Sequence, residues 1–114
     1  MPNMIAGRIS SDMLRGHTDT IILQLLSKKD CYGYEIRKAI IERTGERYEL
    51  KEATLYASFK RLENERAITS YWGDESQGGR RRYYKITEKG FALLKSNKTD
   101  WQFTAGIISS LLEE

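Results

Sequence analysis

The sequence is poor in cysteine, histidine and proline, with only Cys31, His17 and Pro2. A lone cysteine excludes an intramolecular disulfide, and together with a lone histidine it excludes the clusters that bind structural zinc. The near absence of proline excludes a proline-rich linker. These shortages predict an intracellular protein with no metal and no cofactor.

Long apolar runs are also missing, since no stretch approaches the roughly 18 apolar residues of a membrane span. Residues 1–16 lack the basic end and apolar block of a secretion signal. We therefore expect a soluble cytoplasmic protein.

Catalytic patterns are equally scarce. Cys31 and His17 form the only possible thiol pair, and nothing in the spacing brings them together. No phosphate-binding glycine loop of the Walker or dinucleotide type is present. The sequence predicts a protein that is not an enzyme.

The length and charge that are present are modest. With 114 residues the chain has room for one domain, and its net charge of +3 suits a nucleic-acid ligand without demanding one. The position of the charges therefore matters more than their sum.

Apolar residues recur at helical spacing in the first half of the chain. Ser11 or Asp12 can cap the first run, and Asp30 stands at the start of the second. In the third run Leu55, Phe59 and Leu62 form one stripe. We expect helices over Ser11–Lys28, Tyr32–Arg43 and Glu52–Asn64.

A hairpin follows these helices. Ile68–Trp72 and Tyr83–Ile86 are rich in β-branched and aromatic residues, and the polar segment Gly73–Arg82 joins them. Alternation places Tyr84 and Ile86 on the buried face. We assign Trp72 to packing within the strands.

The last element is a helix from Glu88 to about Leu112, with Thr87 as its N-cap. At about 1.5 Å per residue it exceeds roughly 30 Å, too long for so small a domain to cover. A row with alternating steps of three and four predicts a helix-helix seam and hence a homodimer. The row comprises Leu94, Asn97, Trp101, Thr104, Ile108 and Leu111.

The predicted fold is mainly α with a small β-hairpin: a winged helix-turn-helix over residues 1–87 and a dimerisation helix over residues 88–114. In a helix-turn-helix the second helix of the motif enters the major groove of DNA. The candidate contacts on the expected third helix, which include Thr54, Ser58 and Arg61 on its outer faces, are Lys51, Thr54, Tyr56, Ser58, Lys60 and Arg61.

The hairpin adds a second cationic segment. Glycines 78 and 79 accept the positive φ of a tight turn, and the arginines beside them fit phosphate oxygens or a guanine edge. Its candidate DNA contacts are Gly79, Arg80, Arg81, Arg82 and Lys85. The alternative is that these arginines protect an edge strand or pair with Asp74 and Glu75.

Trp101 lies in the middle of the expected seam, between Asn97 and Thr104. A large indole beside two polar residues packs imperfectly and leaves a slot for a planar aromatic ligand. The alternative is that Trp101 is simply part of the dimer core.

The strings ELKEATLYASFKRLENERAI and SYWGDESQGGRRRYYKITEKG resemble the winged helix of PadR-family transcriptional regulators. The resemblance extends from about Ser11 to Ile108, and is strongest to short, drug-sensing members with one C-terminal helix. It implies a homodimeric repressor that places two recognition helices on pseudo-palindromic operator DNA. It also implies a flat pore for planar aromatic drugs at the dimer centre, with candidate residues Met13, Thr20, Gln24, Asn97, Trp101, Thr104 and Ala105.

Four residues depart from the pattern of that family, and two of these, Lys98 and Ala105, stand near the implied pore in place of aromatic and acidic residues. Lys51 stands where a capping residue is usual, which adds positive charge, and Arg66 replaces the glycine usual after the third helix. Two other functions stay open: a winged-helix module that binds proteins, and a DNA-binding repressor without a sensor.

Overall fold

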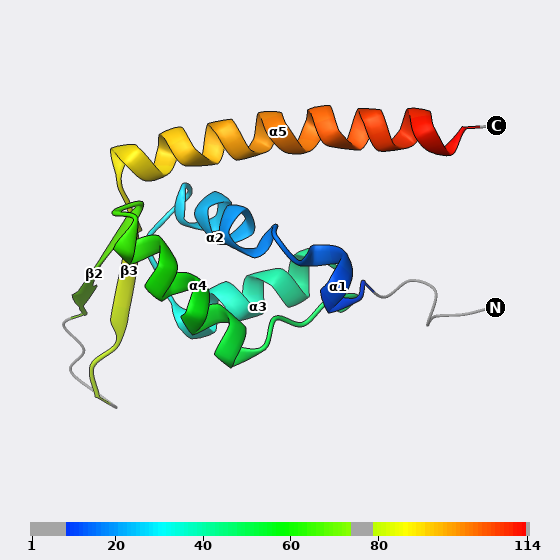
Figure 1. The fold of residues 1–114 in the computed structure, drawn as a ribbon. Helices are drawn as coiled ribbons and strands as arrows, with labels where there is room; N and C mark the ends of the chain where they lie inside the picture. The colour runs from blue at the N-terminus through cyan, green and yellow to red at the C-terminus, as the bar shows by residue number, and fades with distance from the viewer. Residues whose placement is uncertain (1–8, 74–78, 114) are drawn as a thin grey trace.

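A computed structural model describes residues 9–73 and 79–113 of the chain. It has two short N-terminal helices, a helix pair, a three-stranded sheet and a long last helix (Figure 1). The predicted mainly helical fold with a small sheet is confirmed. The elements are α1 (Ser11–Leu14), α2 (Thr18–Leu26), β1 (Cys31–Tyr32), α3 (Gly33–Arg43), α4 (Glu52–Asn64), β2 (Ile68–Trp72), β3 (Arg82–Ile86) and α5 (Glu88–Leu112).

The prediction of one continuous helix over Ser11–Lys28 is wrong, because the helix is interrupted between α1 and α2. Gly16 has φ +89°, in the left-handed region that a continuous right-handed helix does not visit. Ser10 rather than Ser11 or Asp12 caps α1, accepting a hydrogen bond from the Met13 amide at 3.2 Å. The break lets α1 turn away from the axis of α2.

The hairpin is part of a sheet with the strand order β1-β3-β2. The third strand was not predicted: Cys31 pairs with Tyr84 and Tyr32 with Tyr83. Because Tyr32 belongs to β1, α3 begins one residue later than expected. Asp30 accepts a hydrogen bond from the Tyr71 hydroxyl at 2.5 Å, which fastens the loop before β1 to β2.

The core lies where α2, α3 and α4 meet the inner face of the sheet. Leu55, Phe59 and Leu62 of α4 are buried as predicted, and so are Tyr84 and Ile86 of β3. The Phe59 ring stacks on Tyr84 with centroids 3.7 Å apart. This packing holds α4 and the hairpin in one rigid arrangement.

The start of α5 is fixed against the turn after α4. Thr87 is the N-cap as predicted, because its hydroxyl oxygen accepts the Gly90 amide at 3.0 Å. Gly90 lies so close to the turn that an added Cβ would stand 2.1 Å from the Ala67 carbonyl oxygen. Arg66 adopts φ 64°, the left-handed conformation expected where glycine is usual.

The two halves of α5 differ. The first half packs on α2, with Leu94 buried, and the second half extends past α2 (Figure 1). Large apolar side chains are exposed along that second half: Trp101, Phe103, Ile107, Ile108, Leu111 and Leu112. The prediction that Leu94 belongs to a dimer seam is therefore wrong, because this chain's own core already buries it.

Candidate nucleic-acid interface

The outward face of α4 is open. Ala53, Tyr56, Ala57, Lys60 and Asn64 are exposed, and they recur at the spacing of one helix face. Of these, sequence reasoning identified Tyr56 and Lys60 and missed the two alanines and Asn64. Small side chains allow a helix to approach a groove floor closely, and alanine can contact a thymine methyl group.

The prediction that Ser58 contacts DNA is wrong, and so is the prediction that it lies on an outer face of the helix. Its side chain is fully buried, three residues after Leu55 and four before Leu62, on the core side of α4. Its hydroxyl oxygen accepts a hydrogen bond from Arg61 Nη2 at 3.1 Å. A small polar residue at this position lets α4 lie close to α2.

Arg61 is half-exposed but already engaged. Its Nε and Nη2 donate to the two carboxylate oxygens of Asp19 at 2.8 and 2.7 Å. This hydrogen bonding raises the pKa of Arg61. A bidentate pair of this kind fixes α4 against α2, so the structure gives Arg61 a positioning role.

The N-terminus of α4 faces outward without a side-chain cap. Lys51 is the N-cap residue and its side chain makes no capping hydrogen bond, as expected from the sequence. Thr54 is exposed in the first turn. The first amides of a helix carry a partial positive charge, and Lys51 adds a full one, so this end of α4 favours an anion. Arg37 supports it by donating to the Leu50 carbonyl at 2.9 Å.

The arginines of the hairpin have different surroundings. Arg80 lies over the Trp72 ring at 5.3 Å and Arg81 over the Tyr32 ring at 4.9 Å. Gly79 has φ +90°, the positive value predicted for the turn. Gly78, Asp74 and Glu75 lie outside the described residues, so the alternative pairing with those carboxylates stays a prediction.

Arg82 turns toward α4. Its Nε donates to Ser70 Oγ at 2.9 Å, and its Nη2 is 3.4 Å from Glu63 Oε2, which also accepts from Ser70 at 3.0 Å. This group ties the hairpin to α4. Lys85 is exposed on the outer face of β3, as predicted.

Tyrosines cover the outer face of the sheet. Tyr71 stacks on Tyr83, the edge of Tyr83 meets Tyr32, and Tyr32 stacks on Tyr34. The hydrogen bond from the phenol to Asp30 raises the pKa of Tyr71 to about 12. Sequence reasoning missed Tyr32 and Tyr34, although the CYGYE string at residues 31–35, which spans β1 and the start of α3, was a visible signal.

Between α3, α4 and the hairpin lies a hollow of about 500 Å³, called here the wing hollow. Tyr34, Arg37, Tyr56, Arg80 and Arg81 are among its lining residues. Trp72 also lines it and is 54% exposed, so the assignment of Trp72 to strand packing is wrong.

Some of the predicted ligand-binding residues lie between α2 and α5, and the others are mostly exposed. Thr20 accepts a hydrogen bond from Asn97 at 2.9 Å and Gln24 accepts one from Lys98 at 3.2 Å, so these residues join α2 to α5. A hollow of about 360 Å³ beside them is lined by Thr20, Asn97 and Trp101.

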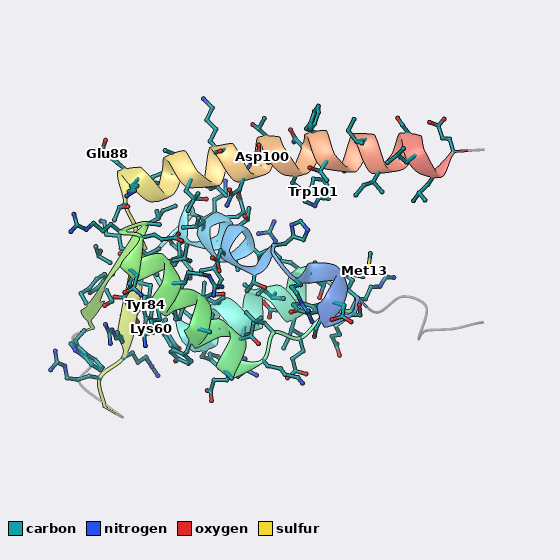
Figure 2. All side chains as sticks on the ribbon, viewed as in Figure 1. Met13, Lys60, Tyr84, Glu88, Asp100 and Trp101 are labelled. Atoms are coloured by element: carbon teal, nitrogen blue, oxygen red, sulfur yellow. The ribbon has the colours of Figure 1, made fainter. Side chains whose placement is uncertain are left out.

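Figure 2 shows Trp101 on the side of α5 that faces α1 and α2, with Met13 on α1 beneath it. Met13 and Thr104 are exposed, and Ala105 is partly buried.

No feature of the described residues points to catalysis. Within residues 9–73 and 79–113 no three acidic, histidine or cysteine side chains gather as metal ligands would. Burial raises the pKa of the Cys31 thiol, which disfavours the thiolate that a nucleophile needs. In the same part of the chain, no helix is both long and apolar enough to cross a membrane.

A helix pair with an open second helix, flanked by a basic hairpin, defines a winged helix-turn-helix protein. The chain belongs to the PadR-like family of transcriptional regulators, whose sequence profile matches residues 22–96. Members of this family regulate transcription, bind DNA and usually dimerise, and they are not enzymes.

Three known proteins are similar to this chain over most of its length. A transcriptional regulator from Clostridium thermocellum is 46% identical, with a TM-score of 0.84, over 90% of this chain and 100% of that one. A PadR family transcription regulator from Clostridium difficile is 41% identical, with a TM-score of 0.75, over 85% and 99% of the two chains. An uncharacterised protein from Lysinibacillus sphaericus is 48% identical over 92% of this chain and 96% of its own length.

Proposed function

We propose that the chain is a repressor that binds pseudo-palindromic operator DNA as a homodimer. Residues 1–87 would read the DNA and residues 88–114 would hold two copies together. The observation that supports this proposal most is the exposed face of α4, whose N-terminus at Lys51 has no side-chain cap, beside the arginines of the hairpin. In this proposal α4, the second helix of the motif, enters the major groove, and the hairpin contacts the backbone.

The alternative function is a winged-helix module whose α4 and hairpin bind a protein partner. A footprint on the DNA flanking its own gene separates the two. We expect two protected half-sites whose centres are roughly 34 to 36 Å apart, or a multiple of that distance. Absence of protection on any duplex at low salt would reject DNA binding, and a single half-site would reject the dimer.

The dimer rests on the second half of α5. Exposed apolar side chains gather there, including Ile107 at 47% and Leu111 at 76% exposed, and a soluble monomer rarely leaves so many together. The partner's equivalent helix offers a matching apolar surface, because a two-fold interface uses the same patch on both copies.

We further propose a sensor at the dimer centre, on the resemblance to the multidrug-sensing repressor LmrR. The support in this chain is the half-exposed Trp101 at the edge of the 360 Å³ hollow between α2 and α5. Such a site would take planar aromatic compounds and release the DNA.

The sensor can be followed by fluorescence, because the chain has two tryptophans. In a Trp72→Phe variant the emission comes from Trp101, and a planar aromatic dye should quench it with saturation. The dye should bind less well to Trp101→Leu, measured by the emission of the dye itself. If the Trp101 emission does not change over the titration, the sensor is rejected, and the alternative of a repressor without a sensor stands.

A further inference from the structure

Two hairpin arginines rest on aromatic rings. Arg80 Cζ is 5.3 Å from the centre of Trp72, and Arg81 Cζ is 4.9 Å from the centre of Tyr32. A ring beneath the guanidinium plane restricts its orientation, and for Arg80 it leaves the N–H groups at the edge able to donate. Each arginine is therefore partly ordered before any ligand arrives.

Paired strands hold the rings themselves. Trp72 is the last residue of β2 and pairs with Arg82, and Tyr32 pairs with Tyr83, whose ring meets it edge-on with centroids 5.4 Å apart. Trp72 is 54% exposed, so its side chain is not part of the hydrophobic core. Its position is better explained by its contact with Arg80 than by core packing.

The wing hollow opens beside these arginines. Tyr34 and Tyr56 bring phenols to it, and both side chains are exposed. Gly33 makes room for Tyr56, because a Cβ at residue 33 would stand 2.7 Å from the Tyr56 hydroxyl. Glu52 also lines the hollow, but the arginines there outnumber it, so the hollow combines an excess of guanidinium groups with hydroxyl donors, a chemistry suited to phosphate oxygens.

The geometry of double-stranded DNA indicates which ligand would occupy the wing hollow. If α4 lies in the major groove and the hairpin reaches the neighbouring minor groove, one sugar-phosphate strand must pass between them. The wing hollow lies at that place, between α4 and the hairpin.

We propose that Trp72 and Tyr32 are positioning residues that hold Arg80 and Arg81 against this strand, and that the wing hollow receives it. This inference rests on the proposed DNA-binding function. Tyr34 and Tyr56 donate to the same strand from the opposite wall.

A double-mutant cycle tests the coupling between ring and arginine. The probe is a dye-labelled, mixed-sequence duplex of about two helical turns, followed by anisotropy at several salt concentrations. Trp72→Leu should weaken binding about 10-fold and lower the salt slope by up to about 0.9, as the loss of one phosphate contact does. Trp72→Phe should retain most of the affinity. In an Arg80→Ala background, Trp72→Leu should have no further effect.

The Tyr32 pair is tested in the same way with Tyr32→Leu, Tyr32→Phe and Arg81→Ala. Phe91→Leu is the matched control, since Phe91 is 48% exposed on α5, outside the wing hollow. It should keep the salt slope of the unmodified protein. Circular dichroism verifies that each variant is folded.

The outcomes separate the two proposals. If the unmodified protein binds the duplex but Trp72→Leu keeps its affinity and slope, the positioning role is wrong and DNA binding stands. Equal losses from Trp72→Leu with and without Arg80 also reject it. If the unmodified protein binds no duplex but binds polyglutamate, the DNA-binding function itself fails.

Discussion

Replacing Ile108 and Leu111 with glutamate should give a folded monomer that binds operator DNA on the order of 100-fold or more weaker than the unmodified protein. Both side chains are exposed in the single chain, at 49% and 76%, so the substitutions leave its core intact. Charges on the shared patch would repel their copies across a two-fold axis and leave each half-site bound alone. Sedimentation measures the mass and anisotropy measures the DNA affinity.

The matched control is Gln102→Glu with Ser109→Glu. It adds the same two charges to α5, but on the side where residues 102, 106, 109 and 113 recur at helical spacing and carry no large apolar group. This variant should remain a dimer. A monomeric control, or a dimeric Ile108→Glu/Leu111→Glu protein, would contradict the assigned interface.

Gly90→Ala should lower the free energy of unfolding by about 2 to 3 kcal/mol, because the packing conflict outweighs the better helix propensity of alanine. The new Cβ would stand 2.1 Å from the Ala67 carbonyl oxygen and 2.6 Å from Ile86 Cγ1. Backbone on one side and a core side chain on the other leave little room to relax. Urea unfolding at one fixed protein concentration measures the change, since dimerisation makes stability depend on concentration.

Gly106→Ala is the control for the same substitution in the same helix. A Cβ there meets no atom within 4 Å, and residue 106 lies on the polar side of α5. It should leave stability unchanged or raise it by up to about 1 kcal/mol. If Gly90→Ala were equally stable, the close approach of α5 to the turn after α4 would not be tightly packed.

Most elements were predictable because their signals are local. The bounds of α4 and β2, the Thr87 cap and the length of α5 follow from periodicity, strand composition and capping chemistry within a few residues. The replacement of glycine by Arg66 left open a left-handed turn or a different loop, and the structure has the left-handed turn that a chain leaving a helix commonly needs.

The errors share a different origin. Strand β1 has two residues, and only its partner β3, far along the chain, makes it a strand. The break at Gly16 was not predicted, because a single glycine does not by itself end a helix.

Ser58 and Arg61 show the same limit within the candidate site. Their polarity predicted an outer face, but the buried hydroxyl and the Asp19 pair belong to the contact between α4 and α2. Sequence patterns give the composition of a helix face, whereas the neighbour that covers it comes from tertiary structure.

The hydrogen bond between Asn97 and Thr20 lies near the point where α5 stops being supported by α2. If that joint tilts by about 5°, the arm from Asn97 to Leu112, roughly 23 Å long at about 1.5 Å per residue, swings its far end by about 2 Å. That displacement is more than half of the roughly 3.4 Å step between successive nucleotides of a strand. A compound bound at this joint would thus need to change the angle of α5 only slightly to move the two copies of α4 out of register with their half-sites.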